Sequence, residues 1–129
     1  MIGSNAFNYI NVLNKAANAS LTRHEIISNN IANVDTPNFK RKDVQFESYL
    51  MTELSGGSSL DQAVAGTDLN SLDETVYTDN SNLSYRLDGN NVDIDTEEAY
   101  LAENQIRYYA LLDSMTQEFS RIRAVLSAN

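Results

Sequence analysis

Residues 95–126 carry the strongest pattern in the sequence, and they read DTEEAYLAENQIRYYALLDSMTQEFSRIRAVL. Large side chains recur in this segment at alternating steps of four and three residues, which is the spacing of one face of a long helix. The members of this heptad stripe are Leu101, Gln105, Tyr108, Leu112, Met115, Phe119, Ile122 and Leu126. The spacing predicts a helix over residues 96–127, about 45 Å long, with Asp95 as its N-cap and Glu98 completing a capping box.

A helix of this length needs a partner along its whole stripe. Burying eight stripe residues returns less free energy than ordering about 30 residues costs. Two kinds of partner fit the periodicity equally well. One is a second helix of the same chain in an antiparallel hairpin, and the other is a neighbouring chain in an oligomeric coiled coil.

A second long helix is predicted over residues 4–33, with Ser4 as its N-cap. Its apolar or small residues recur every three or four positions at Phe7, Ile10, Leu13, Ala17, Leu21, Ile27 and Ile31. The helix must end before Pro37, which lacks a backbone donor and disfavours helical backbone at Thr36. We expect the two helices to pack together as a coiled coil. Because this face is narrow, we also expect neighbouring chains to complete the hydrophobic core.

The middle of the chain is acidic and rich in small residues. Residues 48–80 hold six acids and no base, and SGGSS occupies 55–59. This composition predicts a loose, flexible segment over 51–80 rather than part of a packed core. Two short alternating runs, at 83–87 and 92–94, flank Asp-Gly-Asn-Asn and predict a β-hairpin.

The expected organisation is therefore mainly α in three parts. Residues 1–36 form the N-terminal helix, 37–94 form the loop and hairpin region, and 95–129 form the C-terminal heptad helix.

Composition excludes several classes of function. The chain has 129 residues, a formal net charge of −9 and a pI of about 4.3, so phosphate backbones repel it. It has no cysteine and one histidine, His24, which argues against disulfides, thiol catalysis and zinc. An EF-hand loop starting at Asp88 would place Val92 at the fifth position and Asp93 at the sixth, where a ligand and glycine are required. We expect no metal, no cofactor and no catalytic residue.

The sequence contains no run of about 18 apolar residues that could span a bilayer. The N-terminal segment MIGSNAFNYI has no basic region, no continuous apolar stretch and no small-residue cleavage site. These features, taken alone, predict a cytoplasmic protein.

One segment goes beyond generic patterning. Residues 27–40 read ISNNIANVDTPNFK, which closely resembles the NNIAN…TPGYK motif of bacterial flagellar rod and hook proteins. The segments 41–47, 88–95 and 101–108 are similar to the proximal members of the flagellar basal-body rod protein family. Two positions depart from the motif: Asn38 replaces glycine and Phe39 replaces tyrosine. Asparagine tolerates left-handed backbone, so we expect the turn to survive.

The resemblance implies a structural function. It implies a subunit of the proximal rod that polymerises through its terminal helices into the torque-transmitting drive-shaft, and no enzymatic activity. Implied partners are further copies of itself, FlgC-like rod subunits, the FliE adapter and the MS ring. The resemblance also implies export by the flagellar type III apparatus without signal cleavage, and a periplasmic location in place of the cytoplasmic one.

On this basis the important residues are contacts rather than catalysts. The predicted assembly interface comprises Ile10, Leu13, Ala17, Leu21, Ile27, Asn29, Asn30, Ile31, Asn33, Leu101, Tyr108, Leu112, Met115, Phe119, Ile122 and Leu126. Its members on the first helix are expected to face those on the second, and the three asparagines to tie the helix end to its neighbours. Two alternatives are a soluble helical adaptor or export chaperone that binds a single partner, and an enzyme that uses the acidic middle.

Overall fold

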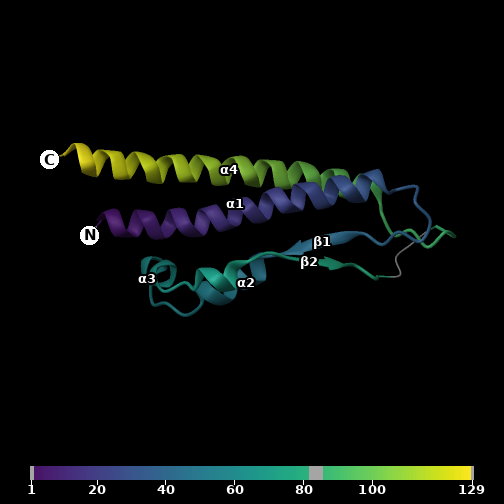
Figure 1. Ribbon diagram of the computed structural model, residues 1–129, viewed down its shortest axis with the longest axis horizontal. Coiled ribbons are helices and arrows are strands. Elements are labelled where there is room, and N and C mark those ends of the chain that lie inside the picture. The colour runs from purple at the N-terminus through teal and green to yellow at the C-terminus, as the bar shows by residue number, and fades with distance from the viewer. Residues whose placement is uncertain (1, 82–85, 129) are drawn as a thin grey trace.

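Two long antiparallel helices form the body of the protein (Figure 1). The computed structural model describes residues 2–81 and 86–128, with side chains from Ala6 onward. Helix α1 spans Ile2–Ala32 and helix α4 spans Ile94–Ser127, and they pack side by side along their lengths. Both termini lie at one end of the molecule, and the turn after α1 and the start of α4 lie at the other. The predicted mainly α fold with two long terminal helices is confirmed.

Helix α4 begins two residues earlier than expected. Its N-cap is Asp93, whose backbone is extended and whose side chain accepts hydrogen bonds from the amides of Asp95 and Thr96, at 3.0 and 3.4 Å. The prediction of Asp95 as the N-cap is therefore wrong. Asp95 instead lies in the first turn, where its charge is favourable near the positive end of the helix dipole.

The middle of the chain forms a third layer along the side of α1 that faces away from α4 (Figure 1). Its elements in chain order are β1 (Lys42–Gln45), α2 (Glu47–Leu54), α3 (Leu60–Ala65), the 3-10 helix η1 (Leu69–Leu72) and β2 (Thr75–Thr78). Strands β1 and β2 pair antiparallel, with Lys42 opposite Thr78 and Gln45 opposite Thr75.

A small two-stranded antiparallel sheet is thus confirmed, but it does not use the predicted strands. Residues 83–85 lie outside the described residues, Val92 and Asp93 lie in a loop, and Ile94 opens α4. The side chain of Asn90 bonds the end of α1, and the side chain of Asn91 bonds the backbone of Arg41 before β1 and of Asp79 after β2.

The main hydrophobic core lies between α1 and the third layer. Its buried members are Val12, Ala19, Phe46, Val64 and Leu72. Val64 and Leu72 come from residues 51–80, so the expectation that this segment lies outside the packed core is wrong. Leu60 and Val76 of the same segment are exposed. Three of its acids bond side chains of α1, and they are Asp61, Asp73 and Glu74. The flexibility of this segment stays a prediction.

Candidate functional site

The segment that resembles the rod motif contains the end of α1 and the sharp turn that follows it. The Asn33 amide still bonds the carbonyls of Asn29 and Asn30, and the Thr36 hydroxyl then donates to the Asn33 side chain at 3.0 Å. Asn38 has a φ of +61°, the left-handed conformation that the replaced glycine would adopt easily. Its amide donates to the Asp88 carbonyl at 2.8 Å. The turn therefore survives the substitution, as predicted.

Asn90 holds this turn against the start of α4. Its buried amide nitrogen lies 2.9 Å from each of three carbonyl oxygens, those of Asn33, Val34 and Thr36. Nearby, Asn91 accepts from the Arg41 amide at 2.7 Å. The two segments that resemble rod proteins are thus bonded to each other, although more than 50 residues separate Asn90 from these carbonyls in sequence.

A buried polar cluster joins all three layers at this end. Asn30 has no exposed surface, and it bonds both the amide and the carbonyl of Lys42, at 2.9 and 2.8 Å. Its amide nitrogen also lies 3.1 Å from Glu97, which is 1% exposed and pairs with Arg41. Burial opposes the charge on Arg41, but the hydrogen bond and charge of Glu97 raise its pKa above the ordinary value. The cluster is a buried and satisfied ion pair that links α1, β1 and α4.

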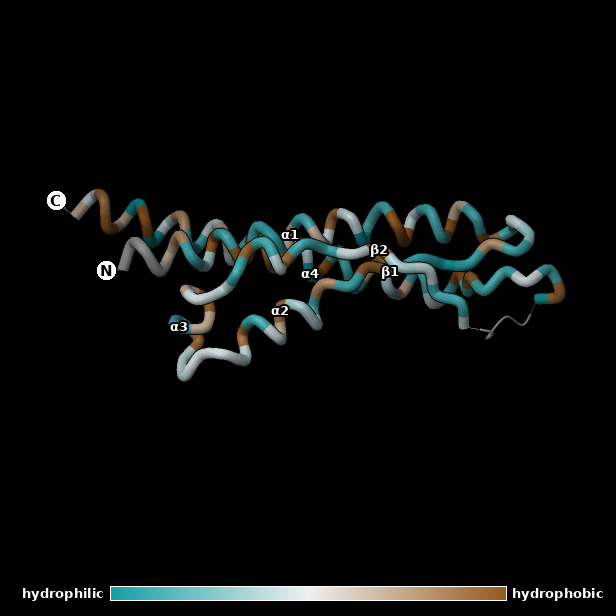
Figure 2. Tube along the Cα trace, turned by 60° about the horizontal axis from the view of Figure 1, so that its bottom comes forward, coloured by the Kyte–Doolittle hydropathy of each residue, from teal (hydrophilic) through white to brown (hydrophobic). Residues whose placement is uncertain are grey.

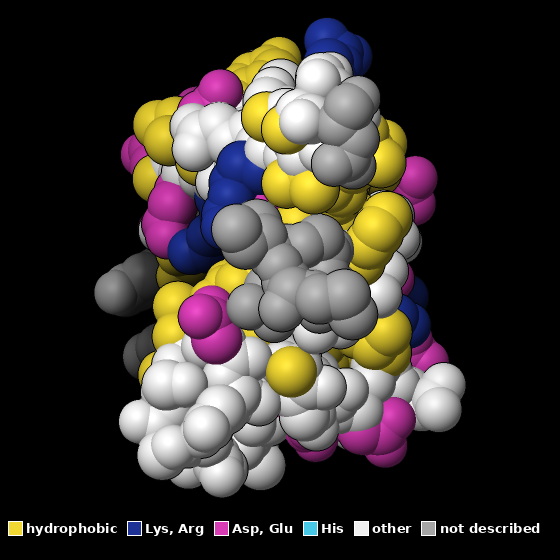
Figure 3. All heavy atoms as spheres, turned by 90° about the vertical axis from the view of Figure 1, so that its left-hand side faces the viewer, with side chains coloured by type: hydrophobic (Ala, Val, Ile, Leu, Met, Phe, Trp, Pro, Cys, Tyr) yellow, Lys and Arg dark blue, Asp and Glu magenta, His cyan; other side chains and the backbone are white. Residues whose placement is uncertain are grey.

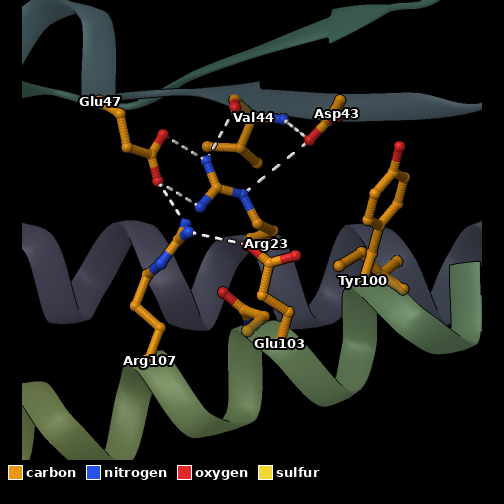
Figure 4. A pocket seen from close by; sticks show the side chains of 9 residues that line it. Arg23, Asp43, Val44, Glu47, Tyr100, Glu103 and Arg107 are labelled. Atoms are coloured by element: carbon orange, nitrogen blue, oxygen red, sulfur yellow. Dashed lines mark hydrogen bonds and ion pairs between the residues drawn. The ribbon is translucent and has the colours of Figure 1, made fainter.

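A hollow of about 300 Å³ lies beside this cluster, between β1, α1 and α4 (Figure 4). Two guanidinium nitrogens of Arg23 donate hydrogen bonds to the Glu47 carboxylate, and one of them also donates to the Val44 carbonyl at 3.0 Å. Arg107 from α4 reaches the same carboxylate at 2.8 Å and bonds Glu103 at 3.1 Å. These charges are paired with one another, so we interpret the hollow as a cluster of ion pairs that connects the three layers.

The ion pairs of this cluster shift the pKa values of Glu47 and Arg23. Burial is the largest single influence on the pKa of Glu47 and tends to raise it, but the hydrogen bond from Arg23, a backbone hydrogen bond and the charges of Arg23 and Arg107 together lower it below the ordinary value. The Arg23–Glu47 hydrogen bond also raises the pKa of Arg23. Among the described residues, no group of three or more His, Cys, Asp or Glu side chains is placed to hold a metal ion.

The seam between α4 and α1 follows a heptad that differs from the one predicted. We call its members the inner stripe, because they are the buried or half-buried residues at alternating steps of four and three on α4. The inner stripe comprises Glu97, Leu101, Asn104, Tyr108, Leu111, Met115, Glu118 and Ile122. Only half of it coincides with the predicted heptad stripe, and three of the other four residues are polar.

The remaining half of the predicted heptad stripe lies on the flank of α4. We call these residues the outer stripe, and they are Gln105, Leu112, Phe119 and Leu126. All four are exposed, and the exposed fraction is 38% for Leu112, 53% for Phe119 and 71% for Leu126. Figure 2 shows hydrophobic residues recurring along both long helices, and Figure 3 shows some of these side chains on the surface at the end that carries both termini.

The flank of α1 extends this apolar surface. Leu21 is 45% exposed and lines a second hollow of about 190 Å³ together with Gln105, Tyr108 and Tyr109. This hollow lies on the side of the helix pair that carries the outer stripe. Its lining is mostly apolar, whereas the hollow at Arg23 is mixed. The free subunit therefore exposes an apolar flank that spans both terminal helices.

The predicted interface residues fall into three groups. Ala17, Ile27 and Asn30 are buried inside the chain. The half-buried group lies along the helix pair and at the end of α1, and it comprises Ile10, Leu13, Ile31, Asn33, Leu101, Tyr108, Met115 and Ile122. The exposed group comprises Leu21, Asn29, Leu112, Phe119 and Leu126. The structure therefore covers the first two groups, fully or in part, within one chain and leaves the third group largely exposed.

Comparison with known proteins decides the family. The profile described as "Flagella basal body rod protein" matches residues 10–40, which include most of α1 and the turn that follows. The flagellar basal body rod protein FlgB of Bacillus subtilis strain 168 is 36% identical over 116 residues, or 89% of this chain and 90% of that protein. The chain belongs to the FlgB family of flagellar basal body rod proteins.

Further FlgB-family relatives agree. FlgB of Borrelia hermsii is 38% identical over 117 residues, covering 81% of this chain and 84% of that protein. FlgB of Escherichia coli K12 is 29% identical over 123 residues, covering 88% of this chain and 89% of that protein. Membership in this rod family makes the chain a structural component of the flagellar basal body. None of the described helices is both long and apolar enough to cross a membrane.

Several residues that organise this FlgB-family subunit were not expected from the sequence. One is Asn104, although an asparagine next to the heptad stripe in a long helix is a sign of a buried polar contact. Another is Glu97, for which no burial was expected. Asn90 was assigned to a hairpin turn, and its three carbonyl partners at the end of α1 could not be found from local sequence.

Proposed function

We propose that the chain is a structural subunit of the proximal rod, which polymerises through its terminal helices into the torque-transmitting shaft. The similarity to FlgB proteins along nearly the whole chain carries this proposal. The apolar flank supports it, because exposed contiguous apolar surface marks protein–protein contacts. Leu112 and Phe119 lie at the centre of that flank. The alternative of a soluble adaptor or export chaperone is not favoured, since the relatives are rod proteins.

The location and partners extend the same proposal. We infer that the subunit works on the periplasmic side of the basal body after export by the flagellar type III apparatus. Further copies of the chain and FlgC-like rod subunits would cover the helix flank, and the FliE adapter and MS ring would contact the base of the rod. The resemblance of residues 27–40 and 88–95 to rod proteins supports these assignments.

A complementation experiment tests the function. A strain of the native host that lacks the gene receives the wild-type gene or a variant with Leu112→Asp and Phe119→Asp. The wild-type gene should restore swimming, and the variant should not, because two carboxylates cannot be buried unpaired at a subunit contact. Ser120→Asp is the control, since it places one such carboxylate on an exposed position next to Phe119.

The control should swim normally, and immunoblots should show all three proteins at equal levels. Normal swimming of the double variant would contradict the role of the apolar flank. Normal swimming of the strain without any copy of the gene would contradict a role in the rod altogether.

A further inference from the structure

A polar pair occupies the middle of the seam between α1 and α4. Ser20 is 2% exposed and Asn104 is 3% exposed. The Asn104 amide donates to the Ser20 carbonyl at 2.8 Å, and the Ser20 hydroxyl donates to the Asn104 side-chain oxygen at 2.9 Å. Both groups are therefore satisfied, but only in one rotation of α4 about its own axis.

That rotation does not bury the most apolar face of α4. A helix turns by about 100° per residue. The inner stripe and the predicted heptad stripe share half of their members and differ by one residue at the others, such as 104 against 105, so their centres lie roughly 50° apart around the helix. If α4 rolled by that angle, Leu112 and Phe119 would pack on α1 in place of Leu111 and Glu118. Rolling would bury more apolar surface, which favours the rolled arrangement.

A second polar contact opposes rolling at the start of α4. Glu97 lies seven residues before Asn104 and is held by Asn30 and Arg41. Beyond Asn104 the described residues of α4 include no buried side chain. Asn104 is thus the last buried contact before the segment that carries Leu112 and Phe119, and the half-buried Arg107 bonds Glu47 one turn later. Buried polar contacts of this kind select one packing arrangement at some cost in stability.

We propose that the Ser20–Asn104 pair holds α4 in the rotation that keeps Leu112 and Phe119 exposed for neighbouring subunits. Asn104 is a positioning residue, because it acts through the orientation of α4 and is itself covered. The inference rests on the proposed function only in assigning neighbouring subunits to the exposed face. Without the pair, α4 turns its apolar stripe onto α1. The free subunit then buries this stripe within its own fold and no longer presents it to neighbours.

Thiol labelling of the free subunit tests the rotation directly, since the chain has no cysteine of its own. Single cysteines are placed by Gln105→Cys on the exposed flank and by Ser114→Cys on the opposite, half-buried flank. Each is combined with Ser20→Ala and Asn104→Leu. Removal of the pair should slow maleimide labelling at 105 and speed labelling at 114, each by about tenfold or more, while the unfolding midpoint rises.

Opposite changes at the two sites distinguish a roll from local unfolding, which would speed both. Unchanged rates at both sites, or faster labelling at both, would overturn the proposal. If far-UV circular dichroism shows that Ser20→Ala with Asn104→Leu does not fold, the same two rates in Asn104→Ala decide, because that change removes the amide without adding bulk.

A second readout, swimming, separates the positioning role of the pair from the proposed rod function. The Ser20→Ala, Asn104→Leu protein, with every outer-stripe residue intact, should fail to restore swimming. A roll seen by labelling together with normal swimming would leave the positioning role standing and remove the proposed interface.

Discussion

Asn30 and Glu97 meet inside the protein although 67 residues separate them in sequence, with 3.1 Å between the Asn30 amide nitrogen and a Glu97 carboxylate oxygen. The contact joins the last turns of α1 to the first turn of α4. Because Asn30 also bonds both backbone groups of Lys42, one side chain links both long helices and the sheet. The motif that identifies the family thus has a role within the subunit as well as any role between subunits.

The first prediction concerns Asn30. Asn30→Ala leaves the Lys42 backbone groups and one Glu97 oxygen without their buried partner, and it should lower the free energy of unfolding by about 2–4 kcal/mol. Urea denaturation followed by circular dichroism measures the loss. Asn29→Ala is the matched control, because Asn29 is exposed, and it should change stability by no more than about 0.5 kcal/mol. Equal effects of the two changes would contradict the assigned role of Asn30.

The second prediction concerns the turn opposite Asn38. Gly89 has a φ of +79°, and a Cβ there would lie 2.7 Å from the Asn38 side-chain oxygen. Gly89→Ala should therefore cost about 1–2 kcal/mol and lower Tm by several degrees. Gly56→Ala is the control, since no atom lies within 4 Å of its added Cβ. A Gly89→Ala protein that melts no lower than the control would refute the described contact between the two loops.

The third prediction concerns acid stability. Hydrogen bonds and the charges of Arg23 and Arg107 together outweigh burial, and they lower the pKa of Glu47 in the folded state below its ordinary value of 4.5. A lowered folded-state pKa means that Glu47 stabilises the fold above its unfolded-state pKa, and that this contribution is lost as the pH falls through the folded-state value. Glu47→Gln should lower stability at neutral pH and flatten its decline in acid. Denaturation midpoints at several pH values check this, and parallel curves for the two proteins would count against the assigned ion pair.

The fourth prediction separates folding from assembly. Leu112 and Phe119 are exposed in the subunit, so Leu112→Asp should change the free energy of unfolding by less than about 0.5–1 kcal/mol. Ile27→Asp should unfold the protein, because Ile27 is 1% exposed and a carboxylate there has no partner. Calorimetry on both variants tests the contrast. A large loss of stability in Leu112→Asp would show that the outer stripe supports the subunit's own core.

Part of this structure could be predicted from sequence because it rests on local pattern. The steps of four and three residues in α4 predicted its length, and Pro37 predicted the end of α1. The turn at Asn38 followed from the resemblance to the rod motif, which carries glycine there, and from the tolerance of asparagine for left-handed backbone. The family followed from residues 27–40, which comprise the last residues of α1 and the turn after it.

The remainder depends on partners that are distant in sequence. Strands β1 and β2 pair across an intervening helical segment, and neither shows a strong alternation of its own. The rotation of α4 was missed because periodicity locates an apolar stripe but does not say which polar residues Ser20 or Asn30 will draw into the seam. The same limit applies to Asn90, whose carbonyl partners come from the end of α1.

The most direct measurement compares thiol reactivity in the free subunit and in isolated basal bodies. A protein with Phe119→Cys, the only cysteine in the chain, is labelled with a maleimide in both states. We expect rapid labelling of the free subunit, where Phe119 is 53% exposed, and strong protection in the basal body, where a neighbouring subunit covers the outer stripe. Equal labelling in the two states would contradict the claim that this face of α4 is the assembly surface.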